Sequence, residues 1–211
     1  MAAPSRRSDG VLVSTRIVIR RVVLSVGRWV ISRGNEGEVR TAQGLDLPRQ
    51  TQLAYFAYGL FQPAELAYGQ VEPFVLRHQP AATRGSLWVR DGIPLLRRDG
   101  KRQIHGWLLH PANPEMYEVI SSFEPRRLFR WREIAIDGRE EPANALVGSS
   151  FEGSKEIDAE SWSSRGDPVF TRGIAEVKSI LEARGSTPFE FAPHEAVDWS
   201  RFFQLLSLIH I

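Results

Sequence analysis

Short runs of aromatic, aliphatic and β-branched residues, separated by glycine and proline, dominate the middle of the chain. The first run is rich in aromatic residues and ends at Gly59, which predicts a strand. Turn-forming residues at 91–94 and a charged segment at 97–102 separate the next runs, so the pattern indicates a meander. The strands predicted here cover residues 53–58, 85–89 and 103–110.

An amphipathic helix is predicted after this meander. Asn113 is suited to cap it, and Pro114 to occupy its first position. Apolar residues then recur at spacings of four and three as far as Phe123, which is the spacing of one helix face. We expect the helix to end at Glu124-Pro125.

Two more strands and a second helix follow in the pattern. Residues 131–136 and 143–147 predict the strands, each followed by a glycine-containing turn. Asp167-Pro168 repeats the signal of a cap followed by proline, and Gly185 is a stop signal for that helix. Strands and helices in this order predict an α+β fold.

Charge is distributed unevenly along the chain. The first 50 residues hold nine arginines and four acidic residues, about +5, whereas the remainder sums to about −3. Their apolar runs are short and irregular, so we expect residues 1–50 to be a basic leader, disordered or non-native. A nucleic-acid-binding arm is disfavoured because aromatic residues are almost missing there. The remaining chain divides into a domain at residues 51–170 and a helical extension at residues 171–211.

Composition excludes several classes of protein. The absence of cysteine rules out disulfides, thiolate zinc sites and cysteine nucleophiles. Arginines interrupt the hydrophobic stretch near the N-terminus, which argues against a membrane span and a signal peptide, so we expect a cytoplasmic protein. His78, His105 and His110 form no His-x-x-x-His pair and no cysteine accompanies them, and we therefore expect no metal.

An ordered set of short motifs runs from about Leu53 to Val169, a little over half of the chain. In order, the motifs are Tyr58-Gly59-Leu60-Phe61, Gly92-x-Pro94, Gly106-Trp107-Leu108, Phe123-Glu124-Pro125 and the residues 143–148. Together they resemble the γ-glutamylcyclotransferase-like family, and in particular a bacterial subgroup of it. The resemblance implies a mixed, partly closed β-barrel with flanking helices.

The resemblance also implies a reaction without a cofactor. Enzymes of that family cyclise a γ-glutamyl group to 5-oxoproline and release an amine or peptide. Glu124 falls at the position of the family's acid/base, and the loop Tyr58, Gly59, Leu60 and Phe61 at the position that binds the glutamyl part. Leu60 and Phe129 depart from the family pattern, because each lacks the hydroxyl usual at its position. The implied partner is a small γ-glutamyl molecule, without nucleic acid or membrane.

Alternatives remain open at the level of sequence. A glutamate after a helix is commonly solvated, and Tyr55, Phe56 and Phe61 have the composition of core strand residues. Trp131 either lines a pocket or packs in the core. The arginines near Glu124 either attract an anionic substrate or form a solvated face; they are Arg126, Arg127, Arg130 and Arg132. The rival function is a catalytically silent member of the fold that binds a metabolite or a protein, and the oligomeric state is left open.

Overall fold

The protein has an α+β fold built around one mixed sheet. The computed structural model describes residues 38–41, 44–124, 127–172 and 175. Six strands are paired in the order β6-β7-β3-β5-β4-β8, and a separate two-stranded sheet pairs β1 with β2. The predicted α+β class is thus confirmed. In this part of the chain the hydrogen-bonded ladder is open, with β6 and β8 as its two edges.

The middle of the sheet is its most apolar part. Strand β3 (Tyr55–Ala57) lies between β5 (Ile93–Pro111), which is antiparallel to it, and β7 (Ala143–Gly148), which is parallel. All three residues of β3 are buried, as are the first five of β7. Strand β6 (Phe129–Ile134) completes this side by antiparallel pairing with β7. Because both faces of β3 are covered, its sequence is a continuous run of apolar and aromatic residues and does not alternate between apolar and polar positions.

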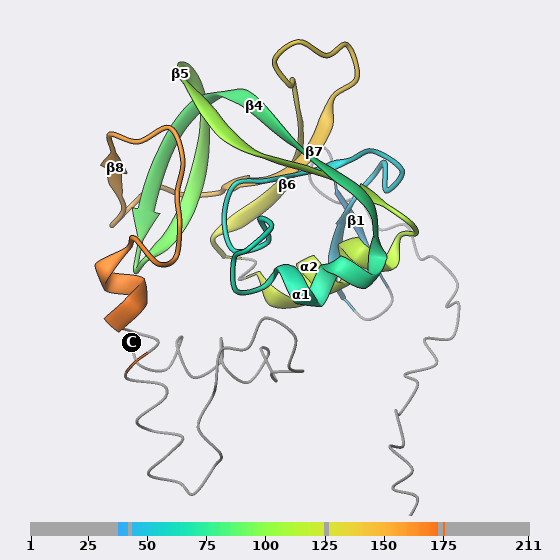
Figure 1. Cartoon of the computed structure of the whole chain (residues 1–211), viewed down its shortest axis with the longest axis horizontal. Coiled ribbons are helices and arrows are strands. Elements are labelled where there is room, and N and C mark those ends of the chain that lie inside the picture. Colours follow the sequence, from blue (N-terminus) through green and yellow to red (C-terminus); the bar gives the residue numbers. More distant parts are fainter. Residues whose placement is uncertain (1–37, 42–43, 125–126, 173–174, 176–211) are drawn as a thin grey trace, which may run out of the picture.

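A long arched hairpin forms the other half of the sheet (Figure 1). It consists of β4 (Val75–Arg90) and β5, joined by the two-residue turn Asp91-Gly92. Both turn residues have positive φ, 53° and 77°, which is the geometry that matches the right-handed twist of a hairpin. A Cβ on Gly92 would lie 2.7 Å from the backbone nitrogen of Phe170, so the later chain packs tightly on this turn.

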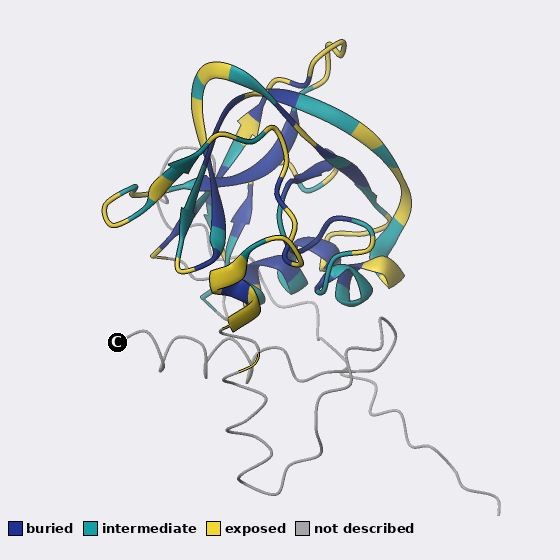
Figure 2. Cartoon of the chain, turned by 60° about the vertical axis from the view of Figure 1, so that its left-hand side comes forward, coloured by how far each residue is buried: buried dark blue, intermediate teal, exposed yellow. Residues whose placement is uncertain are grey.

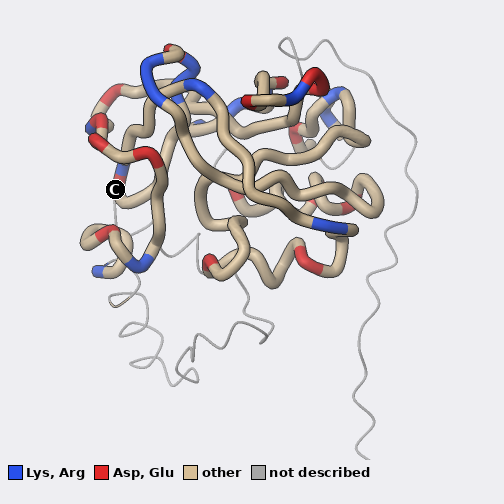
Figure 3. Tube along the Cα trace, turned by 45° about the horizontal axis from the view of Figure 1, so that its top comes forward, with Lys and Arg blue, Asp and Glu red and all other residues tan. Residues whose placement is uncertain are grey.

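The charged segment at residues 97–102 is a bulge and not the predicted turn between strands. Ser86 pairs with Arg97 and Gly85 with Arg102, so the residues between them loop out of β5 while the strand continues. Acidic residues from later segments pair with the bulge: Lys101 lies 3.3 Å from Glu156, and Arg102 pairs with Asp158. Figure 3 likewise shows Lys and Arg close to Asp and Glu at a few places on the described tube.

Three short helical segments lie together on one side of the sheet (Figure 1). They are α1 (Tyr68–Val71), the 3-10 turn η1 (Glu72–Phe74) and α2 (Glu115–Phe123). The α2 helix begins and ends close to the predicted positions, and the Asn113 side chain accepts a hydrogen bond from the Glu115 N–H. Its inward face is buried, and the Tyr117 hydroxyl donates a 2.5 Å hydrogen bond to the Leu53 carbonyl oxygen.

The folded domain begins before residue 51, where the sequence placed its start. Strands β1 (Glu38–Arg40) and β2 (Asp46–Pro48) pair with each other within the predicted leader. Leu47 is completely buried in the hydrophobic core, and the Asp46 carbonyl oxygen accepts hydrogen bonds from side chains of α2 and β6. Residues 1–37 of the predicted leader lie outside the described residues.

The chain after β7 returns across the hairpin. Strand β8 (Lys155–Ile157) pairs with β4, and the helix predicted at Asp167-Pro168 begins there, with the Asp167 carboxylate accepting from two N–H groups of its first turn. Its predicted end at Gly185 and most of the predicted extension lie outside the described residues.

Burial follows the arrangement of the strands. Figure 2 shows buried strands in the interior of the fold and exposed residues on the arched hairpin of β4 and β5. Within the described ranges, no helix has the length and apolar character needed to cross a membrane.

Candidate active site

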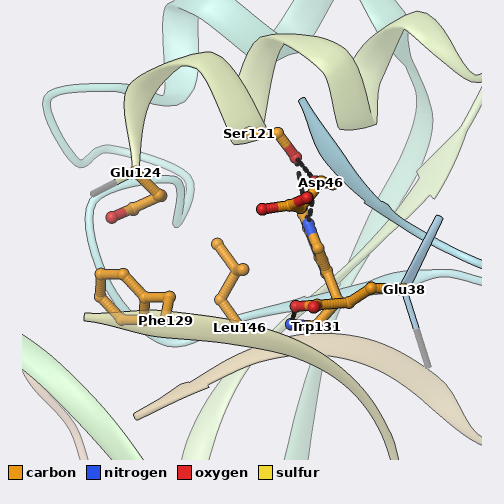
Figure 4. Close-up of a pocket in the computed structure, with 7 residues that line it drawn as sticks. All are labelled: Glu38, Asp46, Ser121, Glu124, Phe129, Trp131 and Leu146. Atoms are coloured by element: carbon orange, nitrogen blue, oxygen red, sulfur yellow. Dashed lines mark hydrogen bonds between the residues drawn. The ribbon is translucent and has the colours of Figure 1, made fainter. Parts of the chain in front are cut away.

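Glu124 leaves the last turn of α2 and turns its side chain toward the sheet. Its N–H still donates to the Ile120 carbonyl oxygen at 3.2 Å, but its own backbone is extended, with φ −83° and ψ 131°. The change from helical to extended backbone carries the side chain off the helix surface. Figure 4 shows the carboxyl group near Phe129, on the opposite side of Leu146 from Trp131 and Glu38.

A small cavity joins Glu124 to the loop that follows β3. Tyr58, Gly59 and Leu60 line it together with Glu124. Its remaining lining consists of Tyr55, Ile93, Pro94, Phe129 and Leu146. Residues that are 65 positions apart in the sequence therefore face the same space. We call this the loop-side cavity.

A second cavity lies on the other side of Glu124, Phe129 and Leu146, which line both. Glu38, Asp46, Ser121 and Trp131 complete its wall, and we call it the acidic-side cavity. The cavity volumes are about 20 Å³ here and about 10 Å³ on the loop side, which is room for roughly one water molecule in each. A ligand larger than water therefore requires the walls to move apart.

The acidic side is held in place by hydrogen bonds. The Trp131 indole N–H donates to the Asp46 carbonyl oxygen at 2.8 Å and to the Ser121 hydroxyl at 3.0 Å, and the Trp131 backbone N–H donates to Glu38 Oε1 at 2.8 Å (Figure 4). Trp131 thus both packs in the core and lines a cavity. Among the residues described, no three histidine, aspartate or glutamate side chains are arranged to hold a metal ion.

Glu124 is half-buried as a whole residue, and the burial of its carboxyl group raises its pKa to about 8. In the described ranges, no side chain or backbone N–H donates a hydrogen bond to its carboxyl oxygens. Two of the neighbouring arginines direct donors to backbone oxygens instead: Arg130 to Phe129 and Arg132 to Trp131. Near pH 7 the carboxyl is therefore mostly protonated, and a modest change in its surroundings is enough to ionise it.

The loop after β3 offers backbone donors. Its carbonyl groups are engaged, because Gly59 accepts from the Gln62 N–H at 3.1 Å and Leu60 accepts from the Ala67 N–H at 3.0 Å. No described residue accepts a hydrogen bond from the N–H groups of Gly59, Leu60 or Phe61. A Cβ on Gly59 would lie 3.1 Å from the Pro94 ring, so a larger residue would crowd the cavity wall.

The two aromatic residues of the predicted binding loop have structural roles. The Tyr58 hydroxyl donates to the Leu146 carbonyl oxygen at 2.6 Å and accepts from the Leu96 N–H at 3.1 Å, while its ring lines the loop-side cavity. Phe61 packs edge-on against Tyr55 and Phe123 and lines neither cavity. Three of the four predicted loop residues therefore face the same cavity as Glu124.

Several lining residues could not be singled out from sequence. Glu38 and Asp46 lie within the predicted leader, and no motif marks them. Tyr55 was interpreted as a core strand residue; it is buried, but it also lines the loop-side cavity. Its place three residues before Tyr58, on the strand that leads into the loop motif, was the available signal.

Comparisons with known proteins leave the family open. No protein-family model matches the chain, and no curated protein matches it. Among solved structures, an allophanate hydrolase from Kluyveromyces lactis is similar over 50% of this chain and 19% of its own, with 13% identity and a TM-score of 0.41. The Arabidopsis thaliana protein At5g39720.1 is similar over 65% of this chain and 96% of its own, with 18% identity and a TM-score of 0.40. The matched part thus spans about a fifth of the hydrolase chain.

Proposed function

We propose that this protein is a γ-glutamylcyclotransferase-type enzyme, which cyclises a γ-glutamyl group to 5-oxoproline and releases an amine or peptide. The observation that carries the proposal is that the Glu124 carboxyl, without a hydrogen-bond donor among the described residues, lines one cavity with Tyr58, Gly59 and Leu60. The sequence motifs pair the same residues as acid/base and binding loop. The partly closed barrel of that fold, a cytoplasmic location and the absence of nucleic-acid and membrane partners belong to the same proposal.

The reaction needs little from the protein beyond geometry and proton transfer. Ionised Glu124 takes one proton from the α-ammonium of the substrate, and the freed nitrogen attacks the γ-carbonyl carbon. The carbon–nitrogen bond to the leaving group then breaks as Glu124 returns that proton to the departing nitrogen. A second proton passes from the attacking to the departing nitrogen, so that an ammonium leaves and Glu124 regains its starting state. Because the attack is intramolecular, folding the substrate supplies most of the proximity.

The high pKa of Glu124 suits this cycle. A carboxyl with a pKa of about 8 is a stronger base than an ordinary glutamate, and about one tenth of it is ionised at pH 7. An arriving α-ammonium favours the ionised form, because an opposite charge nearby lowers a carboxyl pKa. The unpartnered N–H groups of Gly59 and Leu60 supply donors for the oxygens of the glutamyl part.

Release of 5-oxoproline from a panel of γ-glutamyl amines and peptides tests the proposal. We expect the wild type to release 5-oxoproline from at least one compound and Glu124→Gln to lose about 100-fold or more in kcat. Glu118→Gln is the matched control, because Glu118 lies on the same helix and lines neither cavity. Equal loss in both variants, or undiminished release by Glu124→Gln, removes Glu124 from the mechanism.

The second candidate function is a catalytically silent protein that binds a metabolite or another protein at the same place. Leu60 and Phe129 favour it, because each brings an apolar side chain to the cavity wall. Binding of 5-oxoproline or a γ-glutamyl amine without any release of product separates this candidate from the enzyme.

A further inference from the structure

Tyr55 is a buried tyrosine whose hydroxyl has no structural partner. The residue is 4% exposed, and its ring packs edge-on against Phe61 and Trp131 at 6.3 and 5.7 Å between ring centroids. No group in the described part of the chain donates to or accepts from its hydroxyl. Among the described residues the fully enclosed side-chain atoms without a partner are Asn144 Oδ1 and Trp162 Nε1, so the Tyr55 hydroxyl keeps some accessible surface although the residue is buried.

The other buried tyrosines differ in this respect. The Tyr58 hydroxyl bonds to the backbone of Leu146 and Leu96, and the Tyr117 hydroxyl bonds to Leu53 and Asn144. Each of these hydroxyls joins segments that are distant in the sequence. The Tyr55 hydroxyl joins none, although the ring is as deeply buried as theirs.

The loop-side cavity is where the Tyr55 side chain is reachable. Tyr55 lines it together with Glu124 and Gly59. The phenol also lies close enough to Glu124 for the two groups to influence each other, since the Tyr55 pKa is raised first by burial and next by the charge of Glu124. With so high a pKa, the phenol stays protonated and remains a hydrogen-bond donor at every pH at which the protein works.

We propose that the Tyr55 hydroxyl is a catalytic group that donates a hydrogen bond to the γ-carbonyl oxygen of the substrate. This inference rests on the proposed cyclotransferase function and adds a residue to it. When the α-amine attacks, the carbonyl electron pair moves onto that oxygen, and the donor stabilises the negative charge. The pair returns when the leaving nitrogen departs, so Tyr55 neither gains nor loses a proton. A fixed donor in a site sheltered from water is well suited to this task.

Two tyrosine variants separate this role from a structural one. Tyr55→Phe removes a hydroxyl without a partner, so we expect an unchanged urea midpoint and a kcat for 5-oxoproline release that is lower by roughly 100-fold, with little change in KM. Tyr117→Phe removes a hydroxyl with two partners and lines neither cavity, so we expect a lower urea midpoint and nearly full kcat. Undiminished kcat in Tyr55→Phe, or a loss of urea midpoint equal to that of Tyr117→Phe, overturns the inference.

The same comparison can be made without turnover. In 5-oxoproline the lactam oxygen is the former γ-carbonyl oxygen, so calorimetric binding of 5-oxoproline should weaken by about five- to tenfold in Tyr55→Phe, as expected for one lost hydrogen bond. Equal affinity in both proteins overturns the Tyr55 role. If Glu124→Gln abolishes turnover and Tyr55→Phe does not, the cyclotransferase proposal stands and this inference fails. A wild type that neither releases nor binds 5-oxoproline overturns both.

Discussion

Replacing Glu124 by glutamine should make the protein more stable at alkaline pH. The ordinary pKa of a glutamate is 4.5, and burial raises that of Glu124 to about 8. Between these values the unfolded chain ionises Glu124 while the folded protein keeps it neutral. Stability therefore falls as pH rises above about 4.5 and stops falling above about 8, where both states are ionised. Moving the pKa this far destabilises the folded state by up to roughly 5 kcal/mol at high pH.

Urea denaturation of the wild type and Glu124→Gln, measured from pH 4 to pH 9, tests this reasoning. We expect the two free energies of unfolding to be nearly equal at pH 4. The difference should then grow in favour of Glu124→Gln by about 1.4 kcal/mol per pH unit and level off above pH 8. Glu140→Gln, on an exposed turn, should keep the pH dependence of the wild type. Parallel curves for the wild type and Glu124→Gln would refute the burial of this carboxyl.

Two further outcomes follow from the same structure. The kcat/KM for 5-oxoproline release should rise with pH and level off above about 8, because only ionised Glu124 accepts the proton; a flat profile from pH 6 to 9 contradicts this. Gly106→Ala should lower the free energy of unfolding by about 1–3 kcal/mol, since its Cβ would lie 2.4 Å from the Ala57 carbonyl oxygen. Gly166→Ala, whose Cβ would meet its nearest neighbour at 3.7 Å, is the matched control, and equal urea midpoints for the two variants count against the tight contact of β3 with β5.

The central strands and α2 were predictable because each has a local signal. The run before Gly59 predicted β3, and the helical spacing up to Phe123 predicted α2 to within two residues at either end. The Asp91-Gly92 turn likewise predicted the junction between β4 and β5. In these segments the residues favour the observed backbone on their own, so the sequence pattern and the fold agree.

The first half of β4 carried no such signal. Residues 76–78 are exposed, and Leu76 is 73% exposed, so this stretch of the arch shows no alternation of apolar and polar positions. It is a strand because β5 pairs with it along its length, and that pairing partner is not visible in a local pattern. The charged bulge at residues 97–102 was predicted to be a turn between strands, because its local composition favours a turn. Pairing with β4 on both sides of the bulge makes it part of one continuous strand, and this pairing is not visible in the local sequence.

The candidate site could be anticipated only in part. Motif order placed Glu124 and the Gly59 loop in one hypothesis, and the shared cavity is consistent with that pairing. The unpartnered hydroxyl of Tyr55 and the acidic residues on the far side of Glu124 carry no motif. Their presence at the site follows from tertiary packing, which local patterns do not encode.

The strands that the sequence assigned to a leader matter for the chemistry of Glu124. Residues of β1 and β2 close the acidic-side cavity, and the Asp46 carbonyl oxygen holds both α2, through Ser121, and β6, through Trp131. These bonds hold the C-terminal end of α2 against the sheet. Glu124 lies at that end of the helix, and its side chain turns toward the sheet there. Since burial sets the pKa of Glu124, a short hairpin outside every recognised motif helps to keep that carboxyl sheltered from water and therefore basic.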